Sequence, residues 1–443
     1  MRNYLYKLLY RYISLYVRPE DRLVEVDPPN AIIISRYPQS AVLERAESAT
    51  PLAADAAVKR LAAVEELSKE APDFVLLNGT LHRERDIQKL LQDIRSNTSP
   101  ATRVVITYYS SLWRPLVALA SALGVRSKTP ESNWITHDDI TNMLLISDYQ
   151  LVRCESRVLL PVYIPIISYL VNRFIAPLPG IRHLCLVNIA LARPLWPVTE
   201  PETAPSVSIV VAARNEEGNI EQIIQRVPRM GPDDELVFVE GGSTDKTWDK
   251  IGEMAEKYKD KMPILKIQQD GTGKGDAVRK GFGICTKDIL MILDADMTVP
   301  PEDLPRFYEA IRTDKGEYIN GTRLVYPMEK EAMRFFNIIG NKFFAAAFSF
   351  VLGQQFRDTL CGTKVMTREN YEKLAAHRHY FGEFDPFGDF DLIFGCARMG
   401  LKIVEVPITY RERTYGDTNI SRWSHGVLLL RMLLFAAWRI KFI

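Results

Sequence analysis

Residues 289–305 read ILMILDADMTVPPEDLP, and this stretch decides the fold. An apolar run leads straight into Asp294 and Asp296, and two prolines then mark the start of a helix. Unbroken apolar runs are typical of strands covered on both faces of a parallel sheet. Ligands of open α/β sheets bind beyond the carboxyl ends of such strands. The stretch therefore predicts a buried strand that delivers two carboxylates to a cleft.

Asp294 and Asp296 are the candidate metal ligands. They offer only oxygen donors, with no Cys or His nearby in the sequence, which favours a hard ion such as Mg²⁺ or Mn²⁺. An ion of this kind also holds substrate phosphates. The alternative is a solvated turn whose acidic residues begin a helix, because Asp-x-Asp after a strand is a weak signal by itself.

The composition is that of a globular protein with two or three domains. The chain has 443 residues, 47% of them hydrophobic, which is enough to pack a core in each domain. Its 56 Lys and Arg residues balance 55 Asp and Glu residues, so no overall basic field points to a nucleic-acid partner. The five cysteines are scattered without CxxC spacing, which indicates a reducing compartment and argues against a zinc site.

Both ends of the chain have the composition of amphipathic helices. Residues 1–20 carry Tyr, Leu and Ile at helical spacing, without the unbroken apolar core or cleavage site of a signal peptide, and predict a core-facing or interfacial helix. Residues 426–443 interleave apolar side chains with Arg431, Arg439 and Lys441, which suits a helix in the membrane interface or one docked on its own domain. No stretch reaches the about 18 uncharged apolar residues of a spanning helix, so we expect no ordinary span.

Residues 1–195 show an α/β pattern of their own. Apolar runs predict strands at residues 23–26, 31–34, 74–77 and 104–107, and helical patterns occupy residues 53–67, 85–94 and 138–146. Residues 196–206 contain three prolines and little that could pack. We expect them to form the linker between two domains.

The stretch DFVLLNGTLHRERDIQKLLQDIR, residues 73–95, resembles class I S-adenosylmethionine-dependent methyltransferases, in which a strand that ends near the cofactor is followed by a helix. That family has a glycine-rich loop after its first strand, but this chain has Asp27-Pro28-Pro29-Asn30 there. Glycines let a backbone approach a cofactor closely, whereas prolines fix φ and remove donors. The resemblance therefore implies a smaller, truncated methyltransferase-like α/β domain that binds no S-adenosylmethionine and serves in packing or membrane docking.

Residues 207–425 alternate strands and helices at the spacing of a doubly wound nucleotide-binding sheet. Strands are predicted at residues 207–212, 235–239, 264–267 and immediately before Asp294, and a helix follows each of the first three. Residues 270–275 are glycine-rich, contain Lys274 and precede a helix. They are a candidate anion site, with a plain turn as the alternative.

Four motifs stand out in this half. They are VVAARNEEGNI at residues 210–220, VEGGSTDKT at 239–247, GTGKGDAV at 271–278 and LDADMTVPPEDL at 293–304. They resemble family 2 glycosyltransferases of the GT-A fold, and most of all the dolichyl-phosphate mannose synthase and polyprenyl-phosphate glycosyltransferase branch. The resemblance implies a Rossmann-like GT-A domain with three nucleotide-contacting loops and a metal motif.

The resemblance also assigns roles to single residues. Asp294 and Asp296 would hold the divalent metal, Arg323 the diphosphate, and Arg413 would close over the phosphates. The implied nucleotide-sugar-binding residues are Ala213, Arg214, Glu216, Glu240, Gly242, Ser243, Lys274, Asp294, Ala295, Arg323 and Arg413. Two motifs depart from the branch: Glu240-Gly241-Gly242-Ser243 stands where Asp-Asp-Gly-Ser is usual, and Thr298 stands where the branch tends to have a Gln. A hydroxyl or water would then have to substitute for the third metal ligand.

Sugar transfer requires that the charge growing on the leaving nucleotide diphosphate be neutralised. A metal on Asp294 and Asp296, together with Arg323 and Arg413, would supply this electrostatic stabilisation. The candidate catalytic residues are Asp296 and Arg413, with Asp391 or Asp389 as a base near the acceptor and Asp358 as a further base candidate. The acidic residues that precede the apolar run after 391 also suit a helix N-terminus as caps.

These observations predict an inverting glycosyltransferase that moves a sugar from a nucleotide-diphosphate donor to a polyprenyl phosphate at the cytosolic membrane face. Residues 331–352 are rich in Phe and aliphatic side chains, with Arg334 and Lys342 as isolated cations, and suit a second membrane-facing helix. The alternative is that this helix and the C-terminal one pack on each other in a soluble core. Rival functions are transfer to a soluble or glycan hydroxyl, methyl transfer, and a non-catalytic membrane scaffold. The sequence indicates no oligomeric state.

Overall fold

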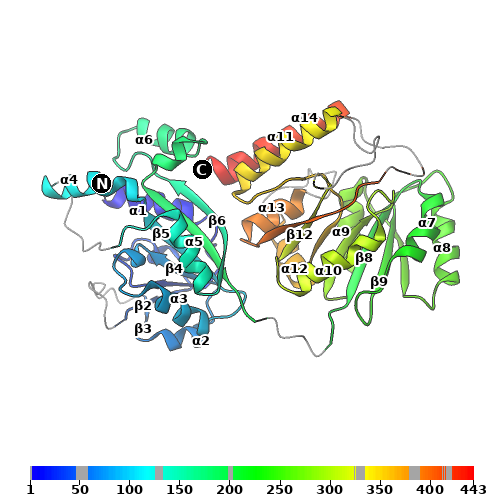
Figure 1. The fold of residues 1–443 in the computed structure, drawn as a ribbon, viewed down its shortest axis with the longest axis horizontal. Coiled ribbons are helices and arrows are strands. Elements are labelled where there is room, and N and C mark those ends of the chain that lie inside the picture. Colours follow the sequence, from blue (N-terminus) through cyan, green and yellow to red (C-terminus); the bar gives the residue numbers. More distant parts are fainter. Residues whose placement is uncertain are drawn as a thin grey trace. The chain divides into compact units, whose positions relative to one another are not determined.

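The computed structural model describes residues 2–45, 58–124, 133–197, 203–323, 325, 335–378, 390–411, 413, 415 and 422–443. The chain folds into two compact units, each with its own sheet (Figure 1). Unit 1 comprises Met1–Pro197 and Ala437–Ile443, and unit 2 comprises Val198–Ala436. Within the described ranges, no helix is long and apolar enough to cross a membrane.

Unit 1 is built on a seven-stranded mixed sheet. Its order is β3 (Lys59–Leu61), β2 (Ser40–Leu43), β1 (Leu23–Val26), β4 (Phe74–Asn78), β5 (Arg103–Tyr109), β7 (Val187–Pro194) and β6 (Tyr149–Arg157). The strands from β3 to β5 pair in parallel, whereas β7 is antiparallel to both β5 and β6. Successive residues of β1 belong to two different apolar cores, as expected of a strand buried on both faces.

The helices of unit 1 are α1 (Arg2–Ile13), α2 (Leu67–Glu70), α3 (Ile87–Ser96), α4 (Arg114–Ala122), α5 (His137–Ile146) and α6 (Ile167–Leu170). The predicted N-terminal amphipathic helix is confirmed as α1, and its apolar side chains face the core of unit 1. The strands predicted at 23–26, 74–77 and 104–107 are confirmed as β1, β4 and β5, and the helices at 85–94 and 138–146 correspond to α3 and α5.

Two sequence-based assignments in unit 1 are wrong. Residues 31–34 form no strand, because this stretch makes turns and a short 3-10 helix at Ile34–Arg36, and the next strand is β2. The helix predicted at residues 53–67 is contradicted over its described part, where β3 pairs with β2. Its Ala, Glu, Lys and Leu content favours a helix locally, but pairing at the sheet edge overrides that weak preference.

The last residues of the chain pack in unit 1. Arg157 is 1% exposed and donates from Nη1 to the Lys441 carbonyl oxygen (2.6 Å) and from Nε and Nη2 to Glu155 (3.0 and 2.5 Å). The Lys441 ammonium lies 3.3 Å from the other Glu155 oxygen. Burial raises the pKa of Glu155, but Arg157 and Lys441 outweigh burial and lower it well below its ordinary value. Lys441 is therefore a buried ion-pair partner, which differs from the exposed cation that the interfacial alternative for residues 426–443 requires.

Glu25 on β1 is a second buried carboxyl in unit 1. Asn78 Nδ2 donates to Glu25 Oε1 at 3.0 Å, and Asn78 Oδ1 accepts from Thr107 Oγ1 at 2.9 Å. Glu25 Oε2 has no hydrogen-bond partner among the described residues. Burial raises the pKa of Glu25 to about 8, although the Asn78 hydrogen bond opposes this shift.

We expect the Glu25→Gln variant to be more stable than the wild type at high pH. Because the folded-state pKa is raised, the stability contributed by Glu25 is fully present below its ordinary pKa and is lost as pH rises through about 8. The variant should gain up to about 5 kcal/mol in free energy of unfolding at pH 9 and little at pH 4. Urea unfolding followed across this range measures the difference, and an equal effect at both pH values would contradict a buried, protonated Glu25.

Unit 2 is built on a second seven-stranded mixed sheet. Its order is β10 (Ile264–Gln268), β9 (Glu235–Glu240), β8 (Val207–Ala213), β11 (Ile289–Asp294), β13 (Lys364–Thr367), β12 (Tyr318–Thr322) and β14 (Ile403–Pro407). The strands from β10 to β11 pair in parallel, β13 is antiparallel to β11 and β12, and β12 and β14 are parallel. The four strands predicted in this half are confirmed, including the buried strand that ends at Asp294.

The helices of unit 2 are α7 (Glu217–Arg226), α8 (Thr247–Lys257), α9 (Lys274–Ile284), α10 (Leu304–Arg312), α11 (Phe335–Leu352), α12 (Arg368–Ala376), α13 (Phe390–Arg398) and α14 (Arg422–Ala436). The amphipathic helices α7, α8 and α10 place their apolar side chains in one core with β8, β9 and β11. Helices α11 and α14 contact each other (Figure 1).

Candidate active site

The carboxyl ends of β8, β9 and β11 meet at one edge of the unit 2 sheet. Their parallel registers place Asp294 beside Ala212 and Glu240 beside Ala213. The chain runs from β8 outward through β9 and β10, then returns to the other side of β8 as β11. The strand order therefore reverses between β8 and β11, which is where open α/β sheets bind ligands.

Backbone-to-side-chain hydrogen bonds join the loops that follow β8 and β9. Ser243 Oγ accepts from the Asn215 amide (3.0 Å), and Asn215 Oδ1 accepts from the Thr244 amide (2.8 Å). Thr247 Oγ1 accepts from the Glu216 amide (2.9 Å). Asn215 has a φ of 56°, a left-handed conformation that Asn tolerates better than most residues. The two loops are thus fixed to each other beside the strand ends.

The predicted nucleotide residues of these loops lie together. Glu240 is buried, and its Oε1 accepts from the Ser243 amide at 2.5 Å, while the Ala213 carbonyl accepts from Gly241 at 2.9 Å. Gly242 has a φ of 71°, which favours glycine there. Arg214 is exposed. In this structure one of the Glu240 oxygens therefore holds its own loop.

Asp294 ends β11 and pairs with Lys274 at the start of α9. The Lys274 Nζ to Asp294 Oδ1 distance is 2.7 Å. Burial raises the pKa of Asp294, but Lys274, with smaller effects from Lys364 and Arg323, outweighs burial and lowers it. The glycine-rich loop is therefore directed at the carboxylate that the sequence identified as a metal ligand.

Asp296 lies between Thr298 and Arg413. Its Oδ1 accepts from the Thr298 amide (3.1 Å) and hydroxyl (2.8 Å), and its Oδ2 accepts from Arg413 Nη2 (2.8 Å). Arg413 Nη1 also lies 3.6 Å from Glu216 Oε1. Burial raises the pKa of Glu216, and Arg413 offsets this only in part. Arg413 thus connects the Asp296 carboxylate after β11 with the Glu216 carboxylate after β8. Arg413 itself lies 117 residues after Asp296 in the chain.

Gly362 packs against the Asp294 carboxylate. A Cβ atom at this position would lie only 1.9 Å from Asp294 Oδ2, so no other residue fits without moving the carboxylate. The same Cβ would lie 2.4 Å from both Cγ and Oδ1 of Asp294, so Gly362 packs against the whole carboxylate. Gly362 was not singled out from the sequence, where a glycine in DTLCGTK shows no distinguishing pattern.

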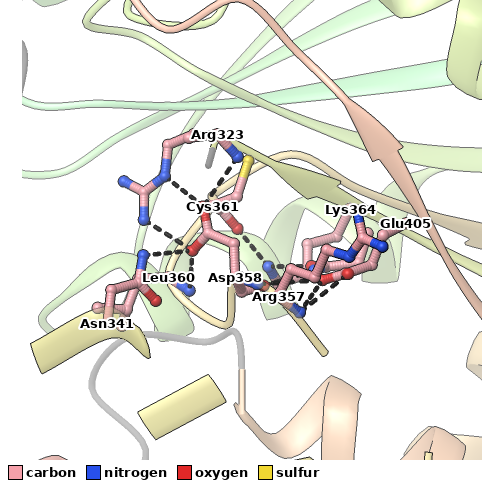
Figure 2. Close-up of polar contacts among 9 residues, drawn as sticks. Arg323, Asn341, Arg357, Asp358, Leu360, Cys361, Lys364 and Glu405 are labelled. Atoms are coloured by element: carbon pink, nitrogen blue, oxygen red, sulfur yellow. Dashed lines mark hydrogen bonds and ion pairs between the residues drawn. The ribbon is translucent and has the colours of Figure 1, made fainter. Parts of the chain in front are cut away.

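Arg323 and Asp358 form a buried bidentate ion pair (Figure 2). Arg323 Nε and Nη2 donate to the two Asp358 oxygens at 2.6 and 2.8 Å. Asn341 Nδ2 of α11 and the Leu360 amide also donate to Asp358, each at 2.9 Å. Burial raises the pKa of Asp358, but Arg323 outweighs it and the pKa falls to about 2. Asp358 therefore positions Arg323 and is unsuited to the base role suggested for it.

A second layer of polar groups holds this pair from behind. Glu405 accepts from the Arg357 and Asp358 amides, at 2.9 and 3.1 Å from the nearer oxygens, and Asn320 Nδ2 donates to the Asp358 carbonyl at 2.7 Å. Lys364 donates to Asn320 Oδ1 at 2.9 Å and to the Cys361 carbonyl. Figure 2 shows these groups around the turn that carries Asp358 and Cys361. The turn is thus fixed at both the Arg323 and the Asp294 side.

The Asp358→Asn variant should lose stability because Arg323 would remain buried without a counter-charge. Breaking one side of a buried ion pair costs roughly 3 kcal/mol. The lowered pKa of Asp358 also shows that its charged form stabilises the fold. Its contribution to the free energy of unfolding is present above its ordinary pKa and is lost as pH falls through about 2. Urea unfolding at pH 7 measures the loss, and an unchanged midpoint would contradict the pair.

Of the two preferred base candidates, only Asp391 is described. It lies in the first turn of α13 and is 3.4 Å from Arg378 and 3.7 Å from Arg279. These ion pairs join α13 to α9 and to the residues that follow α12. They do not involve the residues around Asp294 and Asp296. Asp389 lies outside the described residues.

The residues at the end of β11 fit a divalent cation. Both carboxylates are partly open to solvent, and each is already paired with a cationic side chain. No group of three or more His, Cys, Asp or Glu side chains suited to a metal occurs in the described ranges. The chain would then supply Asp294 and Asp296, and substrate phosphates and water the remaining ligands, as is usual for Mg²⁺. The Thr298 hydroxyl is directed at Asp296 and supports that carboxylate.

Comparison with known proteins agrees with this site. A model described as glycosyl transferase family 2 matches residues 208–375. Glycosyltransferase AglJ of Haloferax volcanii is 31% identical over 229 residues, which are 51% of this chain and 70% of that protein. The chain belongs to glycosyl transferase family 2. The glycosyltransferase has the α/β fold predicted for it, and the residues that match the family model lie in unit 2.

Other relatives of this glycosyltransferase each match about half of this chain. The dolichol-phosphate mannosyltransferase of Pyrococcus furiosus is 28% identical over 220 residues, 48% of this chain and 59% of the relative. An undecaprenyl-phosphate 4-deoxy-4-formamido-L-arabinose transferase of Enterobacter sp. is 26% identical, over 51% of this chain and 65% of the relative. Glucosyl-3-phosphoglycerate synthase from Mycobacterium tuberculosis, solved with Mn²⁺ and UDP, is 20% identical, with a TM-score of 0.40 over 57% of this chain and 86% of that one.

Proposed function

We propose that this glycosyltransferase transfers a sugar, with inversion, from a nucleotide-diphosphate sugar to a polyprenyl phosphate. The observation that carries the proposal is the Asp294 and Asp296 pair at the switch point, flanked by Lys274 and Arg413. This arrangement suits a diphosphate and its cation. The names of the dolichol-phosphate and undecaprenyl-phosphate relatives support a lipid phosphate as acceptor.

The chain's own groups would neutralise the leaving diphosphate. Lys274 begins α9, whose N-terminal amides and positive dipole end favour phosphate. Arg413 is oriented by Asp296 and Glu216, so its guanidinium stays at the site between turnovers. A divalent ion on Asp294 and Asp296 would add charge neutralisation during bond cleavage. The bond between the sugar C1 and the diphosphate oxygen breaks while an acceptor phosphate oxygen bonds to C1 from the opposite face.

A phosphate acceptor relieves the site of the need for a base. Such an acceptor is already anionic near neutral pH, so no proton must be removed before attack. Asp358 is committed to Arg323, and Asp391 forms its ion pairs with Arg279 and Arg378. Transfer to a sugar hydroxyl would require one of these carboxylates to accept a proton. The lipid phosphate therefore suits the described residues better than a hydroxyl.

Helices α11 and α14 support a location at the cytosolic membrane face. They contact each other, as in the soluble-core alternative, but each also keeps large apolar side chains exposed. These are Ile339 and Phe343 on α11 and Val427, Leu430 and Leu434 on α14. Apolar side chains exposed on neighbouring helices suit an interfacial position better than a soluble surface.

Unit 1 is proposed to bind no S-adenosylmethionine. The loop after β1 is closed by the chain's own groups, because Asp27 accepts from the Arg45 amide (3.0 Å) and Nε (2.7 Å). Arg45 Nη2 also bonds to Glu84 at 2.6 Å, and Arg83 donates to the Asp27 carbonyl at 2.9 Å. Since β1 and β4 flank the switch point of this sheet, these ion pairs lie where a cofactor would bind.

Two assays test the proposal. The full chain is incubated with labelled UDP- or GDP-sugars, Mn²⁺ and either a polyprenyl phosphate in detergent or a soluble sugar, and we expect label in the organic phase only with the lipid phosphate. Efficient transfer to the soluble sugar without a lipid product would overturn the acceptor. Calorimetry with S-adenosylmethionine should show no binding, and a saturable signal would overturn the account of unit 1.

A further inference from the structure

Unit 1 carries an apolar surface that its own fold turns outward. Residues 162–170 include α6 and expose Tyr163, Ile164, Ile166, Ile167, Tyr169 and Leu170, with Ile166 at 75%. Leu178 and Leu184 extend the exposed apolar set further along the chain. A contiguous set of large apolar side chains on a protein surface marks an interaction site. We call residues 162–184 the apolar platform.

Buried polar side chains hold the platform in this inverted arrangement. Asn172 is 2% exposed and bonds with Nδ2 to the Leu160 carbonyl (2.8 Å) and with Oδ1 to the Leu160 amide (2.8 Å). Ser168 is fully buried, and its hydroxyl donates to the Val162 carbonyl and accepts from the Ile164 amide, both at 2.7 Å. Two of the buried platform residues are therefore polar while Ile, Leu and Tyr side chains face outward, which is unlike an ordinary soluble surface.

The exposed apolar surface continues onto two neighbouring elements of unit 1. On α4 and its flanks, Leu112, Leu116, Leu119 and Leu123 are all more than half exposed, and the Trp113 indole donates to the Leu184 carbonyl at 2.8 Å. Figure 1 shows α4 and α6 along the same upper edge of unit 1. On the other side, exposed Trp438 contacts Phe174 at 5.7 Å between ring centroids.

The charges of this region are all positive. No Asp or Glu occurs in residues 156–199 or 94–130, whereas Arg114, Arg173 and Arg182 lie in or beside the apolar set. The Arg173 guanidinium stacks over the rings of Tyr169 and Trp438, at 5.4 and 5.3 Å from their centroids. Aromatic rings and arginines at the edge of an apolar face match the boundary between acyl chains and anionic headgroups.

We propose that the apolar platform, with α4 and Trp438, is a docking surface for a bilayer that contains anionic phospholipids. The apolar side chains would enter the acyl boundary, and the arginines would pair with headgroup phosphates. This contact is made by unit 1 and does not depend on which acceptor unit 2 uses. It goes beyond the membrane contact proposed for α11 and α14, and it gives unit 1 a function of its own.

The test is co-sedimentation of the full chain with vesicles of phosphatidylcholine alone or with phosphatidylglycerol. The Ile166→Asp/Ile167→Asp variant should bind anionic vesicles at least about tenfold more weakly, because two apolar contacts are replaced by charges. Leu145→Asp/Ile146→Asp on α5 is the matched control, since it alters two adjacent exposed apolar residues of the same unit, and it should bind like the wild type. Arg173→Gln/Arg182→Gln should weaken binding to anionic vesicles and leave the weak binding to neutral ones unchanged.

Separate readouts keep this proposal distinct from the proposed function. Transfer to a polyprenyl phosphate dissolved in detergent, a reaction of unit 2, should be the same in the platform variant and the wild type. Thermal unfolding followed by circular dichroism shows whether unit 1 of the variant is folded. Equal vesicle binding by the wild type and the platform variant would overturn the proposal. Light scattering supplies a second criterion, because a wild-type dimer that the platform variant converts to a monomer would identify a second copy of the chain as the occupant instead.

Discussion

Replacing Asp294 or Asp296 with asparagine should abolish sugar transfer while the fold stays intact. Each substitution removes one of the two carboxylate charges available to a divalent ion at the end of β11. Loss of charge stabilisation at a leaving diphosphate should lower kcat by roughly a thousandfold or more. The partners Lys274 and Arg413 both reach solvent, so leaving either without its carboxylate costs little stability.

Turnover of labelled donor with and without chelator measures this effect. Asp249→Asn, an exposed aspartate in the first turn of α8, is the matched control and should behave like the wild type. Thermal unfolding of each variant should stay close to that of the wild type. Near-normal activity of both site variants in the presence of chelator would show that the metal assignment is wrong.

Arg413→Ala should have the second largest effect. Arg413 bridges Asp296 and Glu216, so its loss removes a positive charge from the phosphate site and leaves two carboxylates facing each other. We expect kcat to fall by roughly a hundredfold to a thousandfold. Arg413→Lys should recover only part of the activity, because an ammonium cannot hold both carboxylates through separate nitrogens.

Arg411→Ala provides the control for Arg413. Arg411 lies two residues away and is exposed, and its backbone amide donates to the Thr298 carbonyl at 3.0 Å. Its truncation should therefore leave transfer unchanged. Equal losses in the two variants would indicate a general effect on this segment and contradict a specific role for the Arg413 guanidinium.

The part of the fold predicted well from the sequence is the part with strong local periodicity. The strands β8, β9 and β11 are buried on both faces, so their apolar runs are unbroken and their ends are marked by polar residues. Asp294 and Asp296 follow directly from that pattern. In contrast, β2 and β3 are three or four residues long and end among polar residues, so their pairing partner determines them more than their composition.

The contacts missed from the sequence are long-range. Arg323 and Asp358 are 35 residues apart in the chain, and the pairing of β12 with β13 brings them together. From the sequence they are two separate site residues, whereas in the structure they form an ion pair. Gly362 is fixed by its distance to Asp294, which no local pattern encodes. The sequence around Lys441 indicates a cation at the end of a helix, but its ion-pair partner Glu155 lies 286 residues earlier in the chain.

The position of the C-terminal residues affects how membrane binding should be tested. Deleting the chain from Gly426 would remove Lys441 and Ile443 from unit 1 and leave Glu155 and Arg157 buried without their third partner. Breaking such a buried network destabilises a domain by several kcal/mol, about 3 to 5 for a single pair. Loss of liposome binding after truncation would then report misfolding. Substitutions at exposed Leu430 and Leu434 on α14 avoid this problem.

The most direct test of the central claim is the structure of the reaction product. The full chain is supplied with a nucleotide-diphosphate sugar, Mn²⁺ and a polyprenyl phosphate, and the lipid product is examined by mass spectrometry and by NMR of the anomeric carbon. Our account predicts one sugar linked through a single phosphate to the polyprenol, with the anomeric configuration opposite to that of the donor. A product with retained configuration, or a sugar attached only to a hydroxyl, would contradict it.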